Sequence, residues 1–298
     1  MPTQEPLISI ALCTYNGEEF LPEQIDSILA QTYKNLEIVI VDDCSTDKTI
    51  GIINSYSEKD KRIKLFQNET NLGFNKNFEK ALSLTSGEYI SISDQDDIWL
   101  PEKLQRLLTN IKNNWLIFSN SSYLGDLKQG RLLNKFKLPK NYKGILLRNH
   151  VTGHTSLMHR DFLNFVLPFP QLGYYDWWMG FVASYYNQIA FLDEVLTLYR
   201  VHSGSVVQSR LGAGNIKKQE FENTLKMLEA FSEYKNLKPE DKIFISQLKD
   251  AYELRGSESQ SLPLEKIIAN NYRELFPNRK PWKVLTKHIF ARKFSRGI

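Results

Sequence analysis

Short apolar runs alternate with amphipathic segments over the first 120 residues. The apolar runs predict buried strands at 7–13, 36–41, 63–67, 88–93 and 115–119. Between them, apolar residues recur every three or four positions, which predicts helices at 22–31, 47–57, 75–84 and 101–112. Alternating strands and helices predict an α/β fold in which a mainly parallel sheet is flanked by helices.

The pattern is less regular in the second half of the chain. Its apolar runs predict strands at 154–159, 188–192 and 195–199, and its aromatic segment predicts a helix at 176–186. Glycines and serines predict a loop at 203–214. Helical spacing then resumes near 215–236, 239–255 and 261–275. We therefore expect a sheet domain at 1–214 and a helical C-terminal subdomain at 215–298.

Composition narrows the class of protein. The chain has 298 residues, of which 42% are hydrophobic and 24% charged, so it can form a sizeable core and is not a disordered chain. Its net charge of +4 does not by itself indicate nucleic-acid binding, and we expect none. Cys13 and Cys44 exclude a disulfide scaffold and are expected to be free thiols. No export signal or membrane-spanning run is visible, which predicts a cytoplasmic protein.

One segment bears on membrane contact. Residues 277–298 contain seven lysines and arginines and no acidic residue, with Trp282, Leu285, Ile289 and Phe290 interleaved at near-helical spacing. Basic and apolar side chains on one helix are typical of a segment that lies on a membrane surface. The alternative is a helix packed on the domain with a solvated basic face. The first interpretation predicts peripheral contact with the inner face of the plasma membrane.

Polar residues follow three of the predicted strands. They are Thr14–Asn16 after the first strand, Asp42 and Asp43 after the second, and Asp94–Asp97 after the fourth. Ligands of parallel sheets bind at the carboxyl ends of the strands, so we expect one site at this edge. Clustered carboxylates are costly to charge without a cation nearby, and hard divalent ions prefer oxygen ligands. The alternative for Asp94–Asp97 is an acidic surface loop.

Three motifs in this region resemble those of family 2 glycosyltransferases with the GT-A fold. They cover residues 7–101 and read ISIALCTYNG, IVIVDDCSTDKT and NLGFNKNFEKALSLTSGEYISISDQDDIWLP. The later stretch YYDWWMGFVASYYNQIAFLDEVLTLYRVHSGSV resembles the bacterial rhamnosyltransferase-like branch and extends the likeness to about residue 207. The resemblance implies an inverting, metal-dependent glycosyltransferase. Its implied donor is dTDP-L-rhamnose, with a UDP-hexose as the alternative.

The resemblance also implies a nucleotide site on the first two strands. The family's base and ribose contacts, together with their turn, correspond to Thr14, Tyr15, Asn16 and Asp43. An aromatic face can stack on a pyrimidine, and a carboxylate can accept from a ring N–H or a ribose hydroxyl. Asp42 either joins them or caps backbone amides at the strand end. Cys44 departs from the glycine that the family often has at this position.

The acidic run and one histidine are implied to hold the metal. By resemblance, Asp96 and His202 bind Mn²⁺ or Mg²⁺ directly, and Asp97 is expected to cap the helix near Pro101. The remaining implied nucleotide contacts are Lys76, Asp94 and Gln95. A solvated surface position is the alternative for Lys76.

Asp176 matches the general base of the family. A carboxylate there could take the proton of an acceptor hydroxyl as the new bond forms. The alternative, which is compatible with that role, is a helix N-cap before the two tryptophans. Aromatic rings pack on the C–H faces of sugars, and the candidate contacts to donor or acceptor sugar are His154, Tyr175, Trp177 and Trp178. Core packing is the alternative for the aromatic residues.

The implied setting is the assembly of bacterial surface polysaccharide or O-antigen. The expected partners are a nucleotide-diphosphate sugar donor and a glycan acceptor carried on a lipid, and the resemblance leaves a homodimer open. A non-catalytic scaffold that binds sugar nucleotides is the alternative from another class, but it would not need Asp96, Asp176 and His202 together. A nucleotidyltransferase would need a glycine-rich basic loop, and the chain has Thr-Tyr-Asn-Gly instead.

Overall fold

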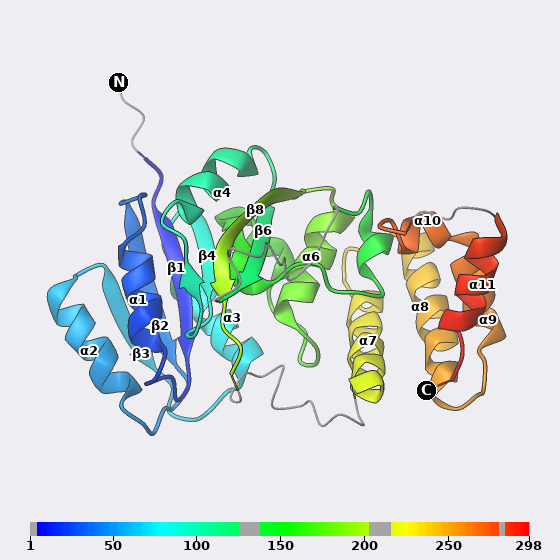
Figure 1. Ribbon diagram of the computed structural model, residues 1–298, viewed down its shortest axis with the longest axis horizontal. Coiled ribbons are helices and arrows are strands. Elements are labelled where there is room, and N and C mark those ends of the chain that lie inside the picture. Colours follow the sequence, from blue (N-terminus) through cyan, green and yellow to red (C-terminus); the bar gives the residue numbers. More distant parts are fainter. Residues whose placement is uncertain (1–4, 125–137, 203–215, 280–283, 298) are drawn as a thin grey trace. The chain divides into compact units, whose positions relative to one another are not determined.

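The structure is a computed structural model that describes residues 5–124, 138–202, 216–279 and 284–297. The chain forms two compact units (Figure 1). The sheet unit comprises residues 1–135, 151–169 and 188–201, and the helical unit comprises 136–150, 170–187 and 202–298. Two segments that the sequence prediction assigned to the sheet domain, 136–150 and 170–187, therefore belong to the helical unit. The predicted loop at 203–214 lies outside the described residues.

The sheet unit contains an eight-stranded sheet in the order β3-β2-β1-β4-β7-β6-β8-β5. Its strands are β1 (Ile8–Thr14), β2 (Leu36–Asp42), β3 (Ile63–Gln67), β4 (Tyr89–Ser93), β5 (Ile98–Trp99), β6 (Leu116–Tyr123), β7 (Ser156–His159) and β8 (Ile189–Tyr199). Strands β1 to β4 are mutually parallel, and β6 is parallel to β8. Strand β7 is antiparallel to both its neighbours, and β5 is antiparallel to β8. The predicted mainly parallel sheet is confirmed.

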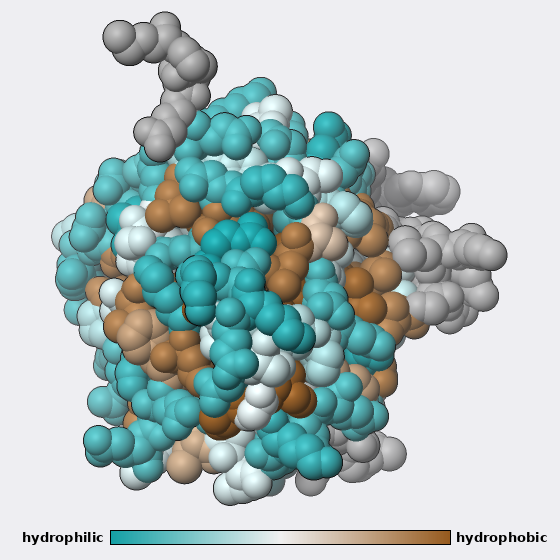
Figure 2. Space-filling view, turned by 90° about the vertical axis from the view of Figure 1, so that its left-hand side faces the viewer, coloured by the Kyte–Doolittle hydropathy of each residue, from teal (hydrophilic) through white to brown (hydrophobic). Residues whose placement is uncertain are grey.

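Helices pack against this sheet because its strands are apolar on both faces. The helices are α1 (Leu21–Leu29), α2 (Thr49–Lys59), α3 (Phe74–Leu84) and α4 (Lys103–Ile111), and the sheet unit also contains the short α5 (Leu163–Val166). Alternate residues of β1, namely Ile8, Ile10 and Leu12, form one cluster with buried residues of α1, α2 and α4. Helix α3 contacts β1 and β2, and its buried Phe78 and Leu82 lie outside that cluster, which places α3 on the opposite face. Hydrophilic residues cover most of the side shown in Figure 2.

Strand β8 corrects one prediction. The sequence predicts two strands separated by charged residues, but β8 runs through them as one strand. Ser119 of β6 pairs with Leu192 and Asn120 pairs with Val195, so Asp193 and Glu194 form an irregularity in the pairing. Asn120 Nδ2 donates to Asp193 Oδ1 over 2.6 Å. The two charged residues interrupt the apolar pattern without ending the strand, as is common at a β-bulge.

The helical unit has an aromatic core. Its helices are α6 (Tyr175–Tyr185), α7 (Ile216–Ser232), α8 (Pro239–Glu253), α9 (Leu262–Asn270), α10 (Tyr272–Leu275) and α11 (Val284–Phe294). Phe231 of α7 stacks on Phe181 and Trp178 of α6, with ring centroids 4.2 and 6.3 Å apart. The single helix predicted at 261–275 is two helices that meet at Asn271. No helix among the described residues is both long and apolar enough to span a bilayer.

Glu37 of β2 is a buried acid that forms hydrogen bonds with residues of β1 and β3 and with the segment before β4. Ser9 Oγ, Ser86 Oγ and Lys64 Nζ donate to its carboxylate over 2.5, 2.8 and 3.0 Å. Burial raises the pKa of Glu37, but these hydrogen bonds and the backbone N–H of Ser86 outweigh burial and lower it from 4.5 to about 2. A carboxyl group whose folded pKa is depressed stabilises the fold above its unfolded pKa.

Replacing Glu37 by glutamine is therefore expected to lower the free energy of unfolding at pH 7 by about 2 kcal/mol, since charge-assisted hydrogen bonds are lost. The wild-type advantage should shrink as the pH falls from 4.5 toward 2, because the wild-type carboxylate then takes up a proton. Urea unfolding at pH 7 and at successively lower pH measures both effects. A difference between the two proteins that does not change with pH would contradict this role of Glu37.

Candidate functional site

The predicted polar edge exists. Thr14 and Asp42 are paired residues at the ends of β1 and β2, and β4 lies on the other side of β1. Asp94–Asp97, the acidic loop, directly follows β4. Because these three strands are parallel neighbours, their carboxyl ends bring the three polar segments to one edge of the sheet.

Gln95 joins the acidic loop to the turn after β1. Its Oε1 accepts from Tyr15 N over 2.9 Å and its Nε2 donates to Tyr15 O over 3.0 Å. A Cβ at Gly17 would overlap the Gln95 side chain. Asn16 adopts a φ of 47°, and its Oδ1 accepts from Thr46 N over 2.8 Å. These contacts leave the Tyr15 side chain 49% exposed at the edge of the sheet, where a ring could stack on a base.

The two aspartates after β2 have different surroundings. Asp42 is buried and accepts from Thr14 Oγ1, Ser45 N and Ser45 Oγ, so the alternative that it caps backbone amides is confirmed. Asp43 is also buried, and its oxygens accept from the groups that order the connection before α3. These groups are Asn68 Nδ2, Leu72 N and Gly73 N, at 2.7, 2.8 and 2.9 Å. A nucleotide contact by Asp43 stays a prediction.

Cys44 lies in the turn after Asp43 with a backbone conformation that favours glycine. Its φ is 70°, in the left-handed region where a residue with a Cβ is strained. Cys13 and Cys44 are both free thiols, as predicted. Lys76 lies on α3, where its Nζ is 3.0 Å from Glu79 Oε1 in a partly exposed ion pair. An exposed ion pair of this kind contributes little to stability, so breaking it to bind a ligand would cost Lys76 little free energy.

Three side chains of the sheet unit meet closely enough to share one cation. One oxygen or nitrogen atom from each of Asp94, Asp97 and His154 lies within 4.8 Å of the others. His154 Nδ1 is 3.6 Å from an oxygen of each carboxylate. Asp97 Oδ2 and His154 Nε2 are buried without a hydrogen-bond partner among the described residues. Oxygen and imidazole donors in this arrangement fit Mn²⁺ or Mg²⁺.

Asp97 is the member of this cluster whose role the sequence analysis misjudged. The prediction that it caps the next helix is wrong, because the residue before α4 is Glu102 and α4 has no side-chain cap. Instead, Asp97 Oδ1 accepts from Arg200 N over 3.2 Å. Burial raises the pKa of Asp97 to about 7, and the charges of Asp94 and Asp96 add to that rise. Burial lowers the pKa of His154, but Asp97 and Asp94 outweigh burial and raise it overall.

Two basic residues form hydrogen bonds with the acidic loop or with His154 next to it. Lys103 is fully buried, its Nζ donates to His154 O, and Nζ lies 3.4 Å from the ring centroid of Trp99. Arg200 Nε donates to Asp96 O over 2.9 Å, which holds the backbone of the loop. Sequence analysis missed both. The signal for Lys103 was its place four residues before Leu107, in the apolar stripe of α4.

Asp176 and His202 belong to the helical unit, whereas the acidic loop belongs to the sheet unit. Asp176 lies in the first turn of α6, and its Oδ1 accepts from Trp177 N over 2.7 Å. A carboxylate at a helix N-terminus is favoured in its ionised form, which is the form that a general base needs. The joint action of Asp176, His202 and Asp96 stays a prediction.

The aromatic residues of α6 lie in the core of the helical unit. Tyr175, Trp177 and Trp178 are each less than a tenth exposed. Trp177 Nε1 donates to Ile145 O over 2.7 Å, and Trp178 stacks on Phe231. Core packing accounts for all three side chains, and a sugar contact by them stays a prediction.

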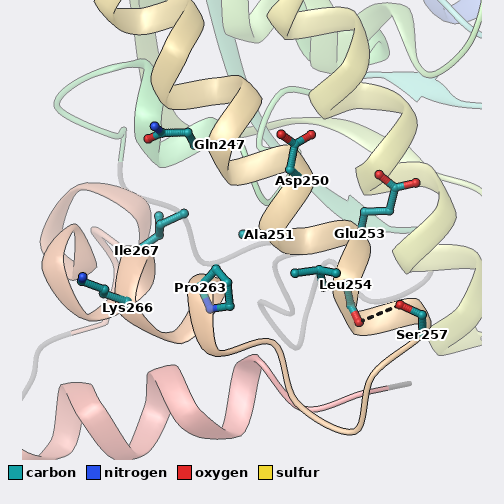
Figure 3. Close-up of a pocket in the computed structure, with 9 residues that line it drawn as sticks. All are labelled: Gln247, Asp250, Ala251, Glu253, Leu254, Ser257, Pro263, Lys266 and Ile267. Atoms are coloured by element: carbon teal, nitrogen blue, oxygen red, sulfur yellow. Dashed lines mark hydrogen bonds between the residues drawn. The ribbon is translucent and has the colours of Figure 1, made fainter.

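A separate open groove of about 690 Å³ lies in the helical unit between α8 and α9 (Figure 3). Figure 3 shows Asp250 and Glu253 on one side and Pro263, Lys266 and Ile267 on the other. None of the residues that line it is a predicted site residue.

The fold is that of GT-A glycosyltransferases. Staphylococcus aureus TarS 1–349, solved in complex with UDP-GlcNAc, has the same fold with a TM-score of 0.64 and 21% identity, over 97% of this chain and 82% of that one. The mannosyltransferase PcManGT from Pyrobaculum calidifontis, in complex with GDP-Man and Mn²⁺, has a TM-score of 0.58 and 18% identity, over 98% and 87% of the chains.

The model of the family "Glycosyl transferase family 2" matches residues 9–166, and the chain belongs to that family. It is therefore a glycosyltransferase, as the sequence motifs predicted. An uncharacterized glycosyltransferase of Haemophilus influenzae is 32% identical over 66% of this chain and 66% of its own length. The UDP-Glc:alpha-D-GlcNAc-diphosphoundecaprenol beta-1,3-glucosyltransferase WfaP of Escherichia coli is 32% identical over 67% of this chain and 79% of its own.

Proposed function

We propose that the protein transfers a sugar from a nucleotide-diphosphate donor to a glycan acceptor, with inversion at the anomeric carbon. The observation that carries the proposal is the acidic loop at the carboxyl end of β4, within the residues that match the family. The residues that we propose for binding and catalysis all lie within 1–214, and residues 215–298 would form the helical C-terminal subdomain. In this proposal Thr14, Tyr15 and Asp43 bind the base and ribose.

A divalent cation, when bound, stabilises the negative charge that develops on the departing nucleoside diphosphate. Asp96 and His202 would hold it, and Asp94, Asp97 and His154 are the alternative donor set. Asp176 accepts the proton of the acceptor hydroxyl while the oxygen of that hydroxyl attacks the anomeric carbon. The bond from that carbon to the diphosphate oxygen breaks on the opposite face, and the configuration inverts.

For the donor, we propose a UDP-sugar. The names of the Escherichia coli relatives WfaP and WfgD specify UDP-Glc, and the TarS structure contains UDP-GlcNAc. These names favour the UDP-hexose alternative over dTDP-L-rhamnose, which the branch resemblance implied. The exposed ring of Tyr15 suits either pyrimidine base, so the donor has to be identified by binding.

For the acceptor, we propose a lipid-linked glycan in the assembly of bacterial surface polysaccharide. The names of WfaP and WfgD specify a diphosphoundecaprenol-linked acceptor, which supports this choice. O-antigen is one such polymer. Peripheral contact of residues 277–298 with the inner face of the plasma membrane and a homodimer are parts of the same proposal.

Thermal unfolding with a panel of nucleotide sugars and Mn²⁺ tests the donor. We expect UDP-glucose or UDP-N-acetylglucosamine, at a hundredfold excess over its Kd, to raise Tm by about 5 °C or more, because a ligand that binds only the folded state stabilises it. Stabilisation by dTDP-L-rhamnose alone would instead assign that donor. Stabilisation without release of the nucleoside diphosphate in the presence of a membrane extract would favour the scaffold alternative, and no stabilisation by any donor would reject the proposal.

A further inference from the structure

Helix α11 has a buried face and an exposed face. Ala291 is fully buried, and the ring of Phe290 lies 5.5 Å from Tyr272 and 4.8 Å from Phe276 between centroids. Phe294 lies 5.3 Å from Phe276. These contacts make one face of α11 part of the core of the helical unit.

The end of α11 is also tied to the connection between α8 and α9. Ser261 N donates to Ser295 O over 2.9 Å, and Gly297 N donates to Ser259 O over 2.9 Å. Arg255 Nε donates to Arg296 O over 3.2 Å. The buried face and these three bonds hold the opposite face of α11 toward solvent in a defined orientation.

That opposite face is basic. Ile289, Arg292 and Lys293 are spaced i, i+3 and i+4, so they lie on one stripe of α11. Arg296 follows two residues after the helix ends, in a bridge to Gln260, and we term these four residues the basic face. All four are exposed, and Ile289 is 59% exposed. Within the described part of the chain, none of the three basic side chains forms a salt bridge, so their charges face solvent.

The C-terminal segment that contains this face is rich in positive charge. From residue 254 to the end, the sequence has ten lysines and arginines and three acidic residues, although the whole chain has a net charge of only +4. Two of the three acids already have partners. Glu274 pairs with Lys143 over 2.9 Å, and Glu265 accepts from Gln260. The segment therefore has a formal net charge of +7, from ten basic and three acidic residues.

We propose that the basic face of α11 binds the anionic headgroups of a phospholipid membrane, with Ile289 in contact with the headgroup and acyl boundary. An exposed apolar residue between cations suits that boundary, where each Lys or Arg gains attraction from the anionic surface. The inference deepens the proposed function, since a lipid-linked acceptor would require the enzyme to work at a membrane. Deletion of the segment cannot test it, because Phe290, Ala291 and Phe294 are core residues.

The test uses the full chain with the substitutions Arg292→Gln, Lys293→Gln and Arg296→Gln. Co-sedimentation with vesicles of phosphatidylcholine and about a third phosphatidylglycerol should be about a hundredfold weaker than for the wild type, because three cations are lost. The matched control replaces Lys235, Lys238 and Lys242, three exposed lysines of the same unit, with glutamine. It has the same net charge and should bind vesicles within about threefold of the wild type.

Equal vesicle binding by the two triple variants would overturn the proposal, as would a wild-type protein that ignores anionic vesicles. A wild type that binds single-stranded RNA but no vesicles would overturn it in favour of a nucleic-acid surface. The Tm increase with a UDP-sugar, measured on the same variants, separates the two proposals. If the wild type does not bind vesicles but is stabilised by a UDP-sugar, only the membrane proposal is rejected. If it binds vesicles but is not stabilised by any donor, only the transferase proposal is rejected.

Discussion

Replacing Asp176 by asparagine is expected to lower kcat by about a thousandfold or more while leaving the Kd for the donor nucleotide within about twofold of the wild type. General base catalysis typically contributes 10²–10⁴-fold, and asparagine cannot take the acceptor proton. The hydrogen bond from Trp177 N can still be accepted by the asparagine oxygen, so the start of α6 should persist. Release of the nucleoside diphosphate and calorimetric binding of UDP measure the two effects.

Glu240→Gln is the matched control for this variant. Glu240 is an exposed carboxylate in the first turn of α8, in the same unit as Asp176. Its loss should leave kcat unchanged within about twofold. Turnover at the wild-type rate in Asp176→Asn would remove Asp176 from the mechanism, and equal loss of UDP binding would show that it acts on the donor instead.

The second large effect is expected at the acidic loop. Asp96→Ala should weaken Mn²⁺-dependent UDP binding by about a hundredfold, because a direct ligand is lost, whereas binding without Mn²⁺ should change little. His154→Ala, which removes the imidazole next to Asp94 and Asp97, should weaken Mn²⁺-dependent UDP binding by about tenfold. Electron paramagnetic resonance of free Mn²⁺, titrated with protein and UDP, measures both constants.

Glu102→Gln is the control, since Glu102 is an exposed carboxylate a few residues after the loop. The ion would have to be reassigned to Asp94, Asp97 and His154 if Asp96→Ala retained wild-type affinity while His154→Ala and Asp97→Asn lost it. Loss of Mn²⁺ binding in the Glu102 variant would indicate a general charge effect and not a ligand.

Local patterns predicted most of the sheet unit because its strands and helices follow one another in βα order. The edge that holds Thr14, Asp42 and Asp94 followed from that order alone, since parallel neighbours end on the same side. The partnership of Asp97 with His154 did not, because it depends on β7 inserting antiparallel between β4 and β6. No sequence period encodes that insertion, and the two residues are 57 positions apart.

Residues that violate their local pattern were the other source of error. Asp193 and Glu194 suggested a strand end, but they are absorbed as an irregularity within β8. Lys103 stands in the apolar stripe of α4 and was not singled out, since a lysine there is expected only when a buried partner accepts from it. Its partner, the carbonyl of His154, comes from a distant part of the chain.

Gln95 lies between Asp94 and Asp96 in the acidic loop. If the loop served only to present these two carboxylates, the residue between them could be of any type. The amide of Gln95 is hydrogen-bonded to the N–H and the carbonyl of Tyr15, and it lies where a side chain at position 17 would begin. The acidic loop and the turn after β1 therefore depend on each other for their conformation. A designer who transplants the acidic loop from another enzyme would therefore have to import the turn after β1 with it. In related sequences, the residues at positions 17 and 95 should accordingly covary.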